Sequence, residues 1–364
     1  MALIARIETF TVPLPALRPF SISGGRVDPV RVLVKVTADD GSCGWGEATP
    51  IPAWTYETTE SIVSSIEGYF APAALGHPLW DLDGLVRLFD RTLNRGYSIG
   101  MPLARAAIDV ACHDALARSR GVSLGGLWGQ RRRDTIELAW IVTGPGSVEE
   151  GLAAGYRHFK VKVGLPGQDP FTTVRAVRQA APGAVVWVDA NQAFTADAAL
   201  RLARRLAELD VAVFEQPVPA NDLAGLRRLR EASPVTIAVD ESLRHPTDLA
   251  TFVSMNAVDV VVAKVQRVGG LTLALRQLHL AEACGLAVWG SGLTESDIGL
   301  AASLHLFAAF GIGTPVDLNG RQFLSSPYAS GLAVEGPVAH VPTGPGLGIE
   351  VDEEWIRRAA RVGR

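Results

Sequence analysis

The feature that most restricts the possible folds is a series of short runs rich in β-branched and apolar residues, which begins near residue 134. The runs cover 135–142, 159–163, 185–189, 211–215, 235–240, 258–264, 287–290 and 314–318. Helical patterns such as 196–209 and 270–283 separate most of them. Strands that alternate with helices form parallel sheets buried on both faces, and eight such units favour a closed barrel. An open doubly wound sheet is the alternative, but no G-x-G-x-x-G motif follows a first strand.

The first part of the chain has a different character. Residues 1–36 show strand patterns with a turn at Ser23-Gly24-Gly25, and helical patterns follow at 57–70 and 102–119. Pro102 stands where a helix accepts proline most readily, at its first position. We therefore predict an α/β protein in which a small α+β unit precedes a parallel barrel.

Three successive strands of the predicted barrel end on a carboxylate: Asp189, Glu215 and Asp240. A single acid at such a place is more often a helix cap or an ion-pair partner, but three matched acids converge on the face where barrel active sites lie. Converging carboxylates repel one another unless a cation joins them. Oxygen ligands without His or Cys favour Mg²⁺, with Mn²⁺ as a possible substitute. Asn191 and Glu241 either hold these ligands in place from behind or cap the following helices.

Lysines end two further strands. In FKVKVG (159–164), Lys160 and Lys162 point to the same side of a strand, and Lys264 ends VVVAK. A lone lysine at such a place usually extends its ammonium group to solvent. A lysine beside the acids can instead act as an acid or base in the reaction. We predict that Lys162 and Lys264 act as bases on opposite faces of one carbon, and that Lys160 lowers the pKa of Lys162 by like-charge repulsion.

This set of residues suits removal of a proton next to a carboxylate. The C–H bond is a very weak acid, and the resulting enediolate concentrates negative charge on oxygen. A divalent cation bound to the carboxylate stabilises that charge. The expected partner is therefore a small-molecule carboxylate.

The composition excludes other classes of partner and site. A net charge of −4 leaves no basic footprint for nucleic acid, and the run Arg131–Arg133 is expected to be a solvated loop. The three cysteines are widely separated, which excludes a disulfide framework or a thiolate zinc site and fits a reducing, cytoplasmic location. No apolar stretch approaches the length of a membrane span.

The sequence resembles the enolase superfamily, specifically the mandelate racemase/muconate lactonizing enzyme family and its muconate-lactonizing subgroup. The matching motifs are KVK at 160–162, VDAN at 188–191, FEQP at 214–217, VDES at 239–242, AKVQRVGG at 263–270, TESDIG at 294–299 and GPGLGIEVD at 344–352. They span nearly the whole chain in the family's order. A lysine base with Mg²⁺ is already the known arrangement of this superfamily.

The resemblance implies a (β/α)7β barrel at 126–340, covered by an α+β capping domain formed by 1–125 and the tail 341–364. It implies Asp189, Glu215 and Asp240 as metal ligands, Lys162 and Lys264 as the acid/base pair, and Glu295 as a carboxylate facing the site. The capping loops Ser21–Arg26 and Ala48–Tyr56 would shape specificity. Family members often assemble, so a homo-oligomer is possible.

The family leaves the reaction open among racemases, epimerases, cycloisomerases and dehydratases. Asp317-Leu318-Asn319 resembles the DxD motif with which dipeptide epimerases hold a substrate ammonium group, although Asn319 replaces the second acid. Asp317 leads us to predict a racemase or epimerase of an amino-acid-like carboxylate. A muconate-type cycloisomerase or an acid dehydratase is the alternative.

Three residues of the capping loops are candidates for substrate contact. Trp54 and Tyr56 form either an aromatic wall, with cation–π contacts to an ammonium group, or simple loop packing. Arg26 either meets a distal carboxylate or lies at the surface. A non-enzymatic alternative is a barrel that binds an anion at Gly290-Ser291-Gly292, but it leaves the acids and lysines unexplained.

Overall fold

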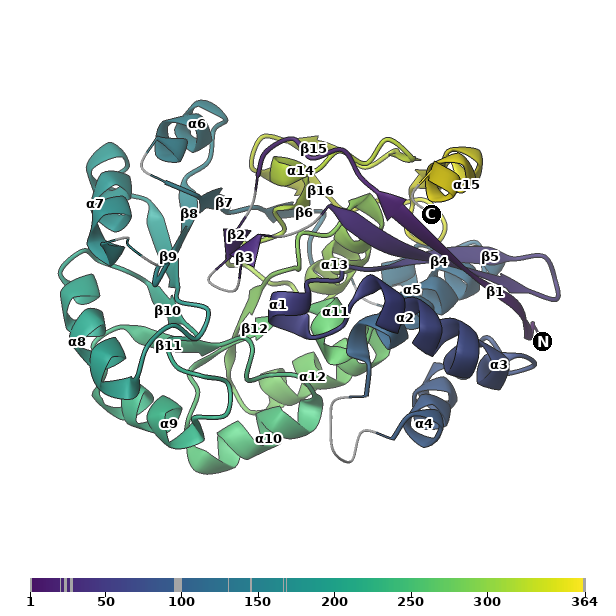
Figure 1. The fold of residues 1–364 in the computed structure, drawn as a ribbon, viewed down its shortest axis with the longest axis horizontal. Coiled ribbons are helices and arrows are strands. Elements are labelled where there is room, and N and C mark those ends of the chain that lie inside the picture. Colours follow the sequence, from purple (N-terminus) through teal and green to yellow (C-terminus); the bar gives the residue numbers. More distant parts are fainter. Residues whose placement is uncertain are drawn as a thin grey trace.

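The structure is a computed structural model that describes residues 2–19, 21–22, 25–26, 29–94, 100–129, 131–144, 146–165, 167 and 169–362, the side chains at 21–22, 25–26 and 361–362 excepted. Figure 1 shows a parallel barrel in teal and green on one side and an antiparallel sheet in purple on the other. The yellow C-terminal helix lies next to the purple sheet, so the last helix and the first strands belong to the same part of the molecule.

Seven parallel strands form the barrel sheet, in the order β13-β12-β11-β10-β9-β8-β7. They are β7 (Trp140–Val142), β8 (His158–Lys162), β9 (Val185–Asp189), β10 (Val213–Glu215), β11 (Thr236–Val239), β12 (Val260–Ala263) and β13 (Ala287–Gly290). Two parallel bridges, Leu138 with Val316 and Ser291 with Asp317, join the ends of this sheet through the segment that follows α13. That segment is the predicted eighth strand in a shortened form, and the predicted (β/α)7β barrel with its cap is confirmed.

The first predicted strand, 135–142, is wrong as a single element. β6 (Thr135–Glu137) pairs with β16 (Val338–His340) outside the barrel, whereas β7 begins at Trp140. Between them the backbone changes partners, because Leu138 donates to Pro337 O at 2.7 Å and Ala139 donates to Val316 O at 2.8 Å. An apolar run contains no signal for such a change of partner.

Helices alternate with the barrel strands along the chain. They are α6 (Ser147–Ala153), α7 (Pro170–Ala180), α8 (Ala196–Ala207), α9 (Leu223–Ala232), α10 (Pro246–Met255), α11 (Val265–Val268), α12 (Leu271–Ala283), α13 (Asp297–Ala309) and α14 (Gly320–Phe323). Helices at the surface turn an apolar stripe inward, as α8 does with Leu202 and Leu206, whereas α13 is buried on all sides.

The inside of the barrel is filled below the C-terminal ends of its strands. Its core cluster comprises Trp187, Val213, Ala238, Val260, Val262 and Trp289. The rings of Trp187 and Trp289 meet edge to face with their centroids 4.8 Å apart. The barrel interior is therefore filled by this layer of side chains, which we call the floor. A site can form only between the floor and the C-terminal ends of the strands.

The cap is built on a three-stranded antiparallel sheet of β1 (Ile4–Pro13), β4 (Val30–Ala38) and β5 (Cys43–Ala48). Its helices are α1 (Pro52–Thr55), α2 (Thr59–Ser65) continued by a π-helical turn (Ile66–Phe70), α3 (Ala71–Ala74), α4 (Leu82–Thr92) and α5 (Pro102–Ser119), with a 3₁₀ turn at Leu124–Trp128. The predicted helix at 102–119 is thus confirmed. α5 packs closely on β5 because Gly46 has no side chain: a Cβ there would lie 1.9 Å from the carbonyl oxygen of Ala107.

The remaining strands are short. They are β2 (Ser21–Ile22), β3 (Gly25–Arg26), β14 (Ala329–Ser330), β15 (Val334–Glu335) and β17 (Glu350–Val351). The final helix, α15 (Glu353–Val362), lies on the cap sheet, where Arg357 Nη2 contacts Glu8 at 2.9 Å. The domain boundaries at 125/126 and 340/341 stay predictions. None of the helices in the described part of the chain is long and apolar enough to cross a membrane.

Candidate active site

The strand register brings the predicted site residues side by side at the C-terminal ends of neighbouring strands. Lys162 on β8 pairs with Asp189 on β9, which in turn pairs with Glu215 on β10. Glu215 pairs with Ala238, so Asp240 follows two residues later on the same face of the sheet. Lys264 comes directly after β12. The acids are fully buried, so their charges interact with each other and with the lysines rather than with solvent.

One side of the site is a chain of hydrogen bonds that starts at Lys162. Lys162 Nζ donates to Asp189 Oδ2 at 2.6 Å and to Asn191 Oδ1 at 3.0 Å. Asn191 Nδ2 donates to Glu241 Oε1 at 3.0 Å, and the backbone N–H of Asn191 donates to Asp189 Oδ1 at 2.9 Å. Asn191 therefore touches both a predicted base and a predicted metal ligand, as expected for a group that orients them.

Lys264 approaches from the other side of the acids. Its Nζ donates to Asp240 Oδ2 at 2.9 Å and lies 4.3 Å from the centre of the Trp54 ring. Trp54 belongs to α1 of the cap, and its Nε1 donates to Glu241 Oε1 at 2.7 Å. The cap thus places an aromatic wall against the second lysine. A substrate contact by Trp54 stays a prediction.

Lys160 lies one layer below, between the floor and the carboxylates. Its Nζ is 4.1 Å from the centre of the Trp187 ring. The same atom lies 2.8 Å from Glu215 Oε2, 2.9 Å from Asp317 Oδ2 and 3.1 Å from Asp189 Oδ2. Lys160 and Lys162 share Asp189, so an intervening negative charge offsets the repulsion between their ammonium groups. The expected effect of Lys160 on the pKa of Lys162 stays a prediction.

Three further predicted residues line the barrel mouth. Asp317 is held by Ser291 Oγ at 3.1 Å and by Lys160, while its Oδ1 accepts no hydrogen bond within the described residues. Oε1 of Glu295 and Oδ1 of Asn319 are likewise buried without a hydrogen bond. Such atoms are expected where a ligand supplies the missing partner. Asn319 also lines a cavity of about 460 Å³ beside Trp140.

The positions of Tyr56 and Arg26 give less support to their predicted contacts with the substrate. Tyr56 follows α1 in a left-handed conformation, and its side chain is 49% exposed. The backbone of Arg26 belongs to β3, but its side chain lies outside the described residues. Both assignments stay predictions.

Burial and neighbouring charges shift the pKa values of the site residues in opposite directions. Burial opposes ionisation of Asp189, but Lys162 and Lys160 outweigh it and lower the pKa of this carboxyl. Burial and the charge of Asp189 raise the pKa of Glu215 well above its usual range. Burial also opposes the charge on Lys160, yet Asp317 and the other acids raise its pKa. Burial lowers the pKa of Lys264.

The donor set fits a divalent cation. Three buried carboxylates supply only oxygen, which suits Mg²⁺ or Mn²⁺. Within the described residues, Asp240 Oδ1 and Glu215 Oε2 accept no hydrogen bond, and they contact Arg267 and Lys160 only as ion pairs. Among the described residues, no group of three or more Asp, Glu, His or Cys side chains has the arrangement of a formed metal site, so the fit rests on the chemistry of the donors. The Lys160 ammonium group lies among these acids and pairs with Asp189 and Glu215.

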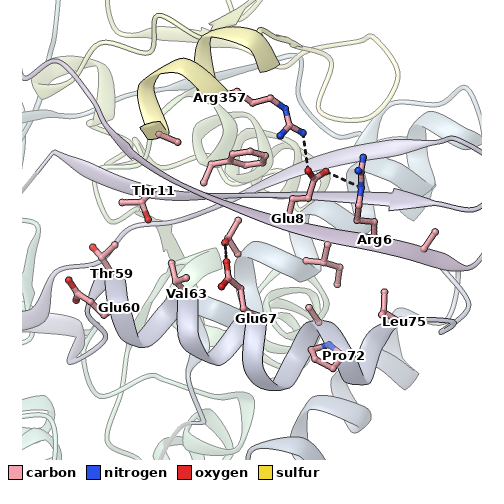
Figure 2. Close-up of a pocket in the computed structure, with 16 residues that line it drawn as sticks. Arg6, Glu8, Thr11, Thr59, Glu60, Val63, Glu67, Pro72, Leu75 and Arg357 are labelled. Atoms are coloured by element: carbon pink, nitrogen blue, oxygen red, sulfur yellow. Dashed lines mark hydrogen bonds and ion pairs between the residues drawn. The ribbon is translucent and has the colours of Figure 1, made fainter. Parts of the chain in front are cut away.

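A separate cavity of about 980 Å³ lies on the outside of the cap, between β1, α2 and α3 (Figure 2). Part of its charge is already paired: Glu8 contacts Arg6 at 3.1 Å and Arg357 at 2.9 Å, and Thr9 donates to Glu67. None of the predicted site residues lines it. The chemistry therefore belongs to the barrel mouth.

The comparisons with known proteins agree with this geometry. Residues 6–129 match the model of the mandelate racemase/muconate lactonizing enzyme N-terminal domain, and residues 146–355 match the enolase C-terminal domain-like model. The chain belongs to this family of the enolase superfamily. The resemblance seen in the sequence motifs is confirmed. Enzymes of the family use a divalent metal ion, generally Mg²⁺.

Three similar proteins catalyse different isomerisations, as their names state. Muconate cycloisomerase 1-2 of Acinetobacter lwoffii is 35% identical, over 98% of this chain and 95% of its own. The N-succinyl Arg/Lys racemase of Bacillus cereus superposes with a TM-score of 0.91 at 27% identity, over 98% of both chains. The L-Ala-D/L-Glu epimerase of Bacillus subtilis has a TM-score of 0.89 at 29% identity, over 95% of this chain and 98% of its own. The chain is thus an isomerase of this family.

Arg267 lies at the site but was not among the residues predicted from the sequence, although it belongs to the motif AKVQRVGG. Arg267 is 8% exposed, its Nε lies 3.4 Å from Asp240 Oδ1, and its guanidinium lies 4.6 Å from the centre of the Trp54 ring. It follows Lys264 by three residues, which is one turn of α11, so helical periodicity after the lysine was the available signal.

Proposed function

We propose that this protein is a divalent-metal-dependent racemase or epimerase of an amino-acid-like carboxylate. The expected substrates are N-substituted amino acids, proline-like acids or dipeptides. The observation that carries the proposal is the placement of two lysines. Lys162 and Lys264 reach the site from different strands, and each is hydrogen-bonded to a different acid, Asp189 and Asp240.

Asp189, Glu215 and Asp240 would hold the metal ion, Mg²⁺ or its substitute Mn²⁺. When bound, the ion would stabilise negative charge on the substrate carboxylate as a Lewis acid. One lysine removes the proton from Cα, and the other, in its protonated form, returns a proton to the opposite face.

The remaining site residues position the reacting groups and the substrate. Asn191 and Glu241 hold Lys162 and Asp189 through the hydrogen-bond chain that ends at Trp54. Asp317, whose Oδ1 has no hydrogen-bond partner among the described residues, would accept from a substrate nitrogen, and Asn319 and Glu295 would contribute further contacts. Trp54, Tyr56 and Arg26 would contact the distal part of the substrate.

The relatives support both this proposal and one alternative. The similar racemase and epimerase act at amino-acid carbons, as their names state, and the two-sided placement of lysines suits that outcome. The 35% identity to a muconate cycloisomerase favours a cycloisomerase as the second candidate. A cytoplasmic location and a homo-oligomer also belong to the proposal, on the basis of the cysteines and of the family.

Isotope exchange in D₂O with Mg²⁺ separates the candidates. We expect deuterium at Cα of an N-succinyl amino acid or a dipeptide, with formation of both configurations, and loss of exchange in excess EDTA. Lactone formation from cis,cis-muconate, with no exchange in any amino-acid derivative, would instead establish the cycloisomerase.

Variants of the two lysines test their roles. Lys162→Ala and Lys264→Ala should each stop exchange of one configuration while leaving the other substrate enantiomer exchanging, because each base faces one side of Cα. Lys35→Ala is the matched control, since Lys35 pairs with Glu353 on the cap. If both variants exchange both enantiomers as the wild type does, the two-base mechanism is wrong.

A further inference from the structure

The segment that carries Glu295 has an unfavourable backbone conformation. It connects β13 to α13, and Thr294 adopts a left-handed φ of 64°. A β-branched residue rarely takes this conformation, so the surrounding structure must hold it. Gly320 allows a close approach from the other side, because a Cβ there would lie 1.7 Å from the carbonyl oxygen of Glu295.

The cap provides the first hold on this segment through Arg31 of β4. The side chain is completely buried, and its Nη2 donates to the carbonyl oxygen of Thr294 at 2.6 Å. Its Nη1 donates to the carbonyl oxygen of Val30 at 2.7 Å. The planar guanidinium group therefore joins the cap strand to the left-handed residue in a fixed geometry.

The second hold is Glu47 of β5, which is buried beside Arg31 with 3.3 Å between Oε1 and Nε. Glu47 accepts the backbone N–H groups of Ser296 at 2.8 Å and Gly299 at 3.0 Å, and the Ser296 hydroxyl as well. Ser296 is the N-cap residue of α13 but makes no side-chain cap of its own. A carboxylate from the cap thus supplies the helix cap, where negative charge is favoured.

We propose that Arg31 and Glu47 are positioning residues that hold Thr294 in its left-handed conformation and thereby direct the Glu295 carboxyl into the active site. Both residues would act through this segment and not on the substrate itself. A buried ion pair alone is weak evidence for a stabilising role. Here, however, the hydrogen bonds of the pair are directed at the residues on either side of Glu295. The kinetic part of the test rests on the proposed function.

The test compares Arg31→Lys and Glu47→Gln with a matched cap variant, Asp114→Asn. Asp114 is also buried and accepts the N–H groups of Trp45 and Leu347, at 2.9 and 2.7 Å, but it does not touch the segment. We expect Arg31→Lys and Glu47→Gln to lower kcat about 10- to 100-fold with little change in KM, and hydrogen exchange at 293–299 to accelerate about tenfold or more. Asp114→Asn should lower Tm while keeping kcat within about twofold.

A rescue experiment separates positioning from general stability. Thr294→Gly removes the penalty for positive φ, so in the Arg31→Lys background it should recover about tenfold in kcat without restoring Tm. Unchanged kcat and exchange in Arg31→Lys, an equal loss of kcat in Asp114→Asn, or failure of the rescue would overturn the inference. An inactive wild type would overturn the proposed function instead, and the exchange measurement at 293–299 would still decide this inference.

Discussion

At the scale of single residues, the site depends on buried charges that compensate one another. Lys160 is the clearest case, because its ammonium group lies within about 3 Å of three carboxylates and has the Trp187 ring below it. Removing one partner from a buried ion pair leaves an uncompensated charge, which costs about 3–5 kcal/mol. Lys160 thus acts on the acids as a fixed counter-charge.

Replacing this counter-charge should make the fold depend on metal. We expect Lys160→Met to lower the free energy of unfolding by about 3–5 kcal/mol in EDTA. Added Mg²⁺ should then stabilise the variant more than the wild type, because the acids retain more negative charge. Urea unfolding with EDTA and with Mg²⁺ measures both effects.

Lys35→Met, on the central strand β4 of the cap sheet, is the control for loss of a paired lysine away from the site. A Lys160→Met protein as stable as the wild type in EDTA would show that the acids do not need this ammonium group.

At the scale of elements, carboxylates from distant parts of the chain accept the first N–H groups of helices that lack a side-chain cap of their own. Glu57, fully buried, accepts the N–H groups of Leu103 at 2.8 Å and Ala104 at 3.2 Å at the start of α5. Pro102 precedes them and has no N–H, and Met101 gives no side-chain cap. Burial raises the pKa of Glu57 from 4.5 to about 7.

This shift predicts a stability that falls as the pH rises. Between pH 4.5 and about 7 the folded protein holds a proton on Glu57 that the unfolded chain has released. Relative to Glu57→Gln, the wild type should therefore lose about 2–3 kcal/mol of unfolding free energy between pH 5 and pH 8. Urea unfolding of both proteins at these pH values gives the difference. Parallel pH profiles for the two proteins would contradict the prediction.

At the scale of the whole molecule, one histidine joins the barrel, the cap and the tail. His305 lies in α13, its Nδ1 accepts from the N–H of Gly125 at 3.4 Å, and its Nε2 contacts the carbonyl oxygen of Leu347 at 3.2 Å. Burial lowers its pKa from 6.5 to about 4, so the folded protein keeps the ring neutral. The neutral ring, with one donor and one acceptor, matches both partners.

Acid should therefore loosen this junction. Because the pKa is lower in the folded state, the stability contributed by His305 is present above pH 6.5 and is lost as the pH falls through about 4. Relative to His305→Gln, the wild type should lose about 2 kcal/mol between pH 7 and pH 5. Thermal or urea unfolding at the two pH values checks this. An equal loss in the variant would assign the acid sensitivity to other groups.

The sequence predicted the fold and the composition of the site because both depend on local periodicity. Strands with a period of two put Lys160 and Lys162 on one face, and parallel strands bring their C-terminal ends, with Asp189, Glu215 and Asp240, to one edge. The division of 135–142 into two strands was not predictable, since β6 pairs with β16 near residue 338, whereas β7 pairs with β8 and Leu138 between them bridges to Val316.

By itself, then, the sequence determined the barrel, the acids and lysines at its mouth, and the family's motif order. Only the tertiary structure decided which charges pair: Lys160 with Asp317 across the barrel, Trp54 against Lys264, and Arg31 and Glu47 on the segment around Glu295. The physical reason is that closure of the barrel and docking of the cap bring together residues far apart in the chain. No local pattern specifies which buried group will then be the nearest partner.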